Sequence, residues 1–261
     1  PMQAARGNPV TDGDGTRQAT LIFPEALTAL MDLPGGKMQS LTSLSVRATE
    51  YTVGPNGPKA MPALLPPTSG YTYAVEYSID EAVAAGAEDV RFNKPVISYI
   101  ENFLNFPVGG IVPVGYYYPK EGTWIASKNG RIVMILGINN GLTDLDIDGS
   151  GVAASATALA SLGITDAERQ QLAILYQPGQ SLWRVTIPHF SPWDYNWPFG
   201  PPANAEAPKM PEPKTGDLLD DPSCSSGSII ECQNQILGES INITGTPFSL
   251  HYGSDRAPGR L

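Results

Sequence analysis

The chain has 261 residues, among them 27 Gly and 25 Pro, and a formal net charge of −10 at pH 7. Gly and Pro together make up about a fifth of it, against about 12% in average proteins. This composition disfavours a helical bundle and a coiled coil, because both need long helices without Pro or Gly. The acidity argues against a nucleic-acid surface. No apolar run approaches the roughly 20 residues that span a bilayer.

The composition favours a mainly β protein, and residues 18–200 are predicted to form a β-sandwich-like module. Residues 1–17 are polar and are expected to be an N-terminal arm or loop. Pro95 should mark an edge or a bulge, and Asn129-Gly130 should be the turn of a hairpin. β-branched and aromatic residues recur in short segments, which predict strands at 19–23, 41–53, 71–77, 90–97, 111–118, 123–126, 131–138 and 182–187.

A short helical insertion interrupts the strands, together with an acidic loop, over residues 141–178. Residues 153–162 are rich in Ala and are expected to be helical. Thr165 and Glu168 have the spacing of a capping box, in which each side chain bonds the backbone N–H of the other residue. A second helix is therefore predicted to begin at Thr165.

The acidic loop has the D-x-D-x-D-G spacing of a calcium-binding loop, in which alternate carboxylates turn toward the ion. The predicted ligands are Asp144, Asp146, Asp148 and Ser150. Ser155 occupies the position where a complete loop of the EF-hand type has a bidentate Glu. The match therefore covers only half of the motif, and a weak calcium site and a solvated acidic turn without an ion both stay open.

The remaining residues are predicted to be a linker and the beginning of a second unit. Residues 201–223 hold six prolines and no aromatic residue, as an extended linker does. Residues 224–261, with expected strands at 228–231, 239–243 and 247–252, are too few for an independent core. Cys224 and Cys232 are expected to form a small disulfide loop if the protein is exported.

The tail carries a resemblance to a known family, through the stretch GTPFSLHYGSDRAPGR at residues 245–260. This stretch resembles the entry to an RHS/YD-repeat shell, as in bacterial polymorphic toxins and teneurin-like surface proteins. The resemblance implies that residues 224–261 are the first strands of a larger hollow β shell around a C-terminal cargo. It also implies a secreted or cell-surface protein whose partner is the remainder of the shell. A generic β-hairpin is the alternative.

A second resemblance rests on His189-Phe190-Ser191, which follows a predicted strand. The same tripeptide marks autoproteolysis in ZU-type β-sandwich modules, and this resemblance implies cleavage between Phe190 and Ser191. The Ser191 hydroxyl would attack the Phe190 carbonyl, and His189 would take up its proton. Pro192 restricts the backbone there. The alternative is an aromatic corner that packs on a sheet, together with Trp193 and its neighbours.

Two functions from different classes follow. The first is a structural and processing module that helps to close or anchor the RHS shell, with self-cleavage by Ser191 as its single-turnover chemistry. The second is a calcium-dependent adhesion or ligand-binding module without cleavage. A turnover enzyme has the least support. Tyr116–Tyr118 and Trp124 are expected to fill a core rather than to form a sugar platform.

Overall fold

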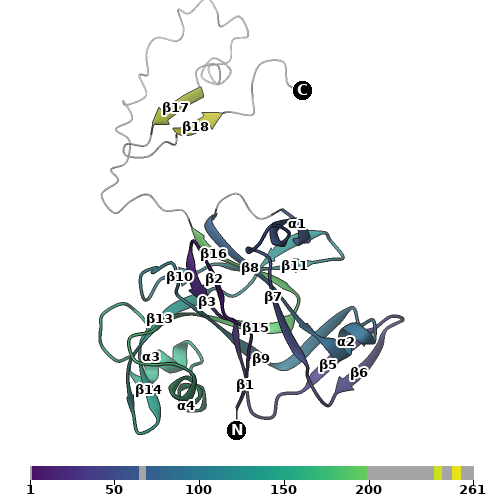
Figure 1. Cartoon of the computed structure of the whole chain (residues 1–261), viewed down its shortest axis with the longest axis horizontal. Coiled ribbons are helices and arrows are strands. Elements are labelled where there is room, and N and C mark those ends of the chain that lie inside the picture. Colours follow the sequence, from purple (N-terminus) through teal and green to yellow (C-terminus); the bar gives the residue numbers. More distant parts are fainter. Residues whose placement is uncertain (1, 65–68, 199–237, 243–248, 254–261) are drawn as a thin grey trace, which may run out of the picture. The chain divides into compact units, whose positions relative to one another are not determined.

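The computed structural model describes residues 2–64, 69–198, 238–242 and 249–253. The chain divides into two units, residues 1–200 and residues 201–261. Strands dominate in Figure 1, which confirms the prediction of a mainly β protein. No helix in the described residues is long and apolar enough to cross a membrane.

The first unit contains two large antiparallel sheets and a small hairpin. The hairpin joins β2 (Val10–Asp12) to β3 (Gly15–Arg17). In the first sheet, β14 (Leu142–Asp146) pairs with β13, whereas β5 (Ala29–Leu33) pairs with β9 and with β6 (Lys37–Leu41). The main path of this sheet runs in the order β1 (Gln3–Arg6), β4 (Thr20–Phe23), β9 (Asp89–Glu101), β15 (Ser181–Phe190), β13 (Gly130–Asn139) and β10 (Ile111–Val112).

The second sheet has five strands, and helices are short and few. The strand order is β12 (Thr123–Ala126), β11 (Val114–Tyr118), β16 (Pro192–Pro198), β8 (Ser69–Ile79) and β7 (Val46–Glu50). The described helices are α1 (Gly57–Ala60), α2 (Asp80–Ala84), α3 (Ala156–Ser161) and α4 (Asp166–Leu175). In the second unit, β17 (Gly238–Asn242) and β18 (Ser249–Gly253) form an antiparallel hairpin close to two of the predicted strands.

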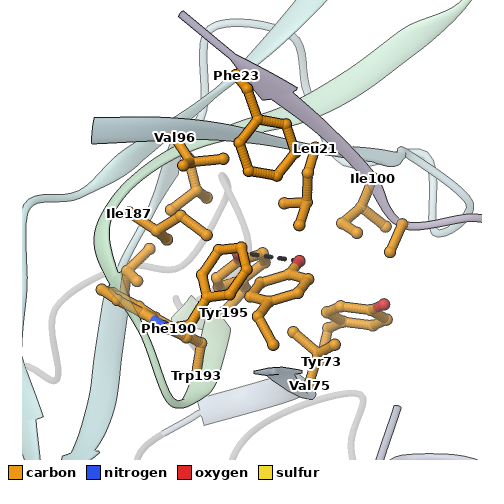
Figure 2. Close-up of a cluster of buried hydrophobic side chains, with 14 of the residues drawn as sticks. Leu21, Phe23, Tyr73, Val75, Val96, Ile100, Ile187, Phe190, Trp193 and Tyr195 are labelled. Carbon is orange, nitrogen blue, oxygen red and sulfur yellow. Dashed lines mark hydrogen bonds between the residues drawn. The ribbon is translucent and has the colours of Figure 1, made fainter. Parts of the chain in front are cut away.

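Two hydrophobic cores cover both faces of the first sheet. One core joins the two sheets and contains Trp183, Phe190 and Trp193, and Figure 2 shows part of it. The other core lies on the opposite face, where Leu182 packs with Leu172 of α4. Neighbouring residues of a strand point to opposite faces, so Leu182 and Trp183 enter different cores. The central strand β15 is therefore buried on both sides over most of its length, and Leu182, Trp183, Val185 and Ile187 are fully buried.

Residues 3–17 contain three strands, whereas the sequence predicts an arm or loop over residues 1–17. β1 pairs with β4 at the border of the first sheet. Arg17, at the end of β3, is only 1% exposed and bonds the carboxylates of Asp12 and Glu50. Because Glu50 lies on β7 of the second sheet, this pair of bonds ties the N-terminal hairpin to the sandwich.

The turn predicted at Asn129-Gly130 does not join a hairpin. β12 pairs with β11 in the second sheet, whereas β13 begins at Gly130 in the first sheet, so the two flanking strands separate. Pro95 lies where the pairing of β9 with β15 is irregular, between the pairs Arg91–His189 and Val96–Ile187. This position agrees with the predicted bulge.

Candidate functional site

The His189-Phe190-Ser191 segment lies where the chain passes from one sheet to the other. β15 ends at Phe190 in the first sheet, and β16 begins at Pro192 in the second. Ser191 is the single residue between them. Its carbonyl accepts a hydrogen bond of 3.2 Å from the backbone N–H of Tyr77 on β8. The corner is therefore held by backbone pairing on both sides of the Phe190–Ser191 bond.

Phe190 belongs to the core between the sheets (Figure 2) and is 6% exposed. Its ring centroid lies 4.8 Å from that of Phe92, 5.7 Å from that of Tyr77 and 6.3 Å from that of Phe23. These partners come from both sheets and include edge-on contacts, which aromatic rings prefer. The predicted packing role of Phe190 is confirmed.

His189 is half-buried against two aromatic rings, those of Tyr116 at 4.6 Å and Trp193 at 5.1 Å between centroids. Burial lowers the pKa of the imidazole, because the charged form loses water. Asp89 opposes this shift and Arg91 adds to it. His189 is therefore neutral at pH 7, the state in which an imidazole can accept a proton.

The Ser191 hydroxyl donates a hydrogen bond of 3.4 Å to the carbonyl of Pro192. Within the described residues, no hydrogen bond joins it to His189. Among the residues that the structure describes, the non-glycine residues with positive φ are Ala26, Asn105 and Asn140, so none lies at this corner. Attack on the Phe190 carbonyl would thus require the hydroxyl to leave Pro192, and the predicted cleavage stays a prediction.

The acidic loop is organised around Asp146, which is 2% exposed. Its carboxylate accepts backbone N–H bonds from Asp148 (3.1 Å), Gly149 (2.8 Å) and Gly151 (2.8 Å). Gly149 has a φ of +82°, which glycine adopts without strain. The loop N–H groups therefore satisfy both oxygens of the buried carboxylate.

The other predicted calcium ligands have partners of their own. Asp144 bonds Asn139 and, at 3.4 Å, Arg169, while Asp148 accepts the N–H of Ser150 at 3.0 Å. In the part of the chain that the structure describes, no group of three or more His, Cys, Asp or Glu side chains could hold a metal. These N–H bonds hold the loop in its conformation, and they neither require nor exclude an ion. Calcium stays a prediction of the sequence.

An Asp146→Ala substitution separates the two interpretations of the loop. If Asp146 acts only as an acceptor for the loop N–H groups, the variant should lose about 1–3 kcal/mol of unfolding free energy equally in calcium and in EDTA. The measurement is a pair of denaturation curves, with the exposed Asp166→Ala as the matched control. A calcium-dependent rise in melting temperature that vanishes in Asp146→Ala would instead support the calcium site.

A buried polar cluster that the sequence did not reveal lies on the face of β15 that packs against α4, opposite the core between the two sheets. The Glu168 carboxylate is fully buried and accepts bonds from the Arg184 guanidinium at 2.7 and 3.0 Å and from the Tyr99 hydroxyl. The predicted N-cap is confirmed, because Thr165 accepts the Glu168 N–H at 3.2 Å. The Glu168 side chain, however, turns to Arg184 instead of back to Thr165.

The two predicted disulfide partners, Cys224 and Cys232, lie outside the described residues. Comparison of the chain with protein-family models, with curated proteins and with solved structures finds no match.

Proposed function

We propose that the first unit is the structural and processing module of a secreted or cell-surface RHS-repeat protein, and that it anchors the β shell that follows. The observation that carries this proposal is the place of β16. This last strand of the module pairs with β11 on one side and with β8 on the other. The chain that continues toward the tail therefore leaves from the interior of a sheet.

Burial strengthens this anchor. Trp193 and Tyr195 of β16 are fully buried between the sheets, and Val114 and Tyr73 pair with Tyr195 from either side. Pulling β16 out would break two ladders of hydrogen bonds and expose two large rings. A module that ends in this way resists tension from the downstream chain.

The anchoring role can be tested in the full-length protein that contains this chain. The variant is Trp193→Ala, which weakens the packing of β16 between the sheets. The exposed Thr49→Ala on β7 is the control. If the module closes or anchors the shell, Trp193→Ala should expose the C-terminal region to an added protease, and Thr49→Ala should leave it protected. Equal protection in both variants would reject the anchoring role.

The processing step is a single cut at Phe190–Ser191. Oγ of Ser191 attacks the Phe190 carbonyl carbon while His189 takes the hydroxyl proton. The His189 imidazolium then gives this proton to the nitrogen as the C–N bond breaks, so that the nitrogen leaves as the amine of Ser191 and an ester joins the two residues. Water hydrolyses the ester to a Phe190 carboxylate and restores the Ser191 hydroxyl.

Mass spectrometry of the purified chain tests this cut. We expect the masses of two fragments, residues 1–190 and 191–261. In native size-exclusion chromatography these fragments should elute together, because β16 stays paired on both sides. Ser191→Ala should give one intact chain, Ser191→Cys should still cleave, and His189→Ala should slow cleavage about 100- to 10,000-fold. The pKa of His189 is lowered, so the imidazole keeps its proton only at pH values below 6.5, the ordinary pKa of histidine. The cleavage rate should therefore fall only when the pH is lowered below 6.5. An intact mass of 27.8 kDa after prolonged incubation would leave packing as the only role of the corner.

A further inference from the structure

A cavity of about 510 Å³ opens on the helix-covered side of the first sheet. Its lining comes from β9, from β15, from the turn between α3 and α4, and from the residues that precede β13. Pockets that bind small molecules have volumes of about 300–1,000 Å³. The size of this cavity thus suits a small organic ligand.

The charges on the cavity wall favour an anion. Lys94, Lys128 and Arg184 line it, and Glu168 is the only carboxylate among the described residues of the wall. Glu168 and Arg184 neutralise each other through their two hydrogen bonds. The two lysines therefore leave a local excess of positive charge, although the chain as a whole is strongly acidic.

Neither lysine is held by a carboxylate in the described residues. Lys94 donates to the backbone carbonyl of Glu25 at 2.7 Å, and Lys128 is exposed. Most other cations of the first unit, in contrast, have a carboxylate partner within 4 Å: Arg6, Arg17, Arg47, Arg91, Lys120 and Arg169. The free charge of the two lysines is available to a ligand.

The remaining lining determines what kind of anion fits. Ser127 and Thr186 also line the cavity, and neither hydroxyl has a hydrogen bond to another described residue, so each can donate to a ligand oxygen. Pro24, Ile97 and Leu162 add apolar surface. Inorganic phosphate has no apolar part to cover these residues, whereas an organic carboxylate has both the charge and the apolar body.

We propose that this cavity binds a small organic carboxylate, with the anionic group between Lys94 and Lys128 and the apolar body against Ile97 and Leu162. The buried Glu168–Arg184 pair forms a fixed wall and does not take part in charge recognition. This proposal is independent of the cleavage at Ser191 and of the shell.

Isothermal titration calorimetry of the full chain with 4-phenylbutyrate tests the proposal, with the uncharged 4-phenylbutyramide as the matched ligand. We expect saturable binding of the carboxylate and binding of the amide weaker by about tenfold, the equivalent of two exposed charge interactions. The double variant Lys94→Gln/Lys128→Gln should lose the same factor. Lys37→Gln/Lys59→Gln removes two lysines that do not line the cavity and should bind as the parent chain does.

Three results would overturn the proposal: no saturable binding of 4-phenylbutyrate, equal affinity for the carboxylate and its amide, or unchanged affinity in Lys94→Gln/Lys128→Gln. All four lysines are exposed, so the variants should fold alike. Their melting curves verify this before the titrations.

Discussion

Replacing Glu168 with Leu should lower the free energy of unfolding by about 3–5 kcal/mol, the usual cost of removing one partner of a buried ion pair. Glu168 is completely buried and Arg184 almost so, and the guanidinium would lose both of its bonds to the carboxylate. The hydroxyl of Tyr99 would lose its acceptor as well. Burial is the largest cause of the raised pKa of Tyr99, and burial is unchanged in the variant, so this hydroxyl stays protonated.

Denaturation followed by tryptophan fluorescence measures this effect, because all four Trp residues lie in the first unit. Glu88→Leu is the matched control, since Glu88 is exposed and lies 3.9 Å from Lys120, a geometry worth at most about 1 kcal/mol. The double variant Glu168→Leu/Arg184→Met should recover part of the loss, because no charge is left buried without a partner. If Glu168→Leu lost less unfolding free energy than Glu88→Leu, water would have to reach the Glu168–Arg184 pair.

Phe190→Ala should cost about 3–5 kcal/mol of unfolding free energy, as large-to-small changes of aromatic core residues do. The ring fills the space between the sheets and contacts Phe23, Tyr77 and Phe92, so its removal leaves a cavity that strands of two sheets cannot easily close. The measurement belongs in a Ser191→Ala background, where no cut at this bond can contribute to the loss.

The control for Phe190→Ala is Ile174→Ala on α4. Ile174 is 73% exposed, so this variant should change stability by no more than about 0.5 kcal/mol. If Phe190→Ala also lost less than about 1 kcal/mol, the corner would be able to repack, and the aromatic cluster would not be what holds the two sheets together there.

Local patterns in the sequence predict most of the elements, because a strand or a helix needs side chains of the right kind at the right period. The alternating residues of 71–77 lie in β8, and the Thr165 N-cap begins α4. Pro95 disturbs strand pairing as its missing N–H requires. The sequence alone also indicates the His189-Phe190-Ser191 corner and the aromatic packing of Phe190.

The tertiary structure decides which elements meet, because periodicity shows that a face is buried but not what covers it. Asn129-Gly130 has the composition of a hairpin turn, yet the strands beside it join different sheets: β12 pairs with β11, and β13 pairs with β15. Glu168 fits the capping box in sequence but pairs with Arg184, since a buried guanidinium needs a carboxylate. Asp146 has the spacing of a metal ligand, but its buried oxygens accept N–H groups of its own loop.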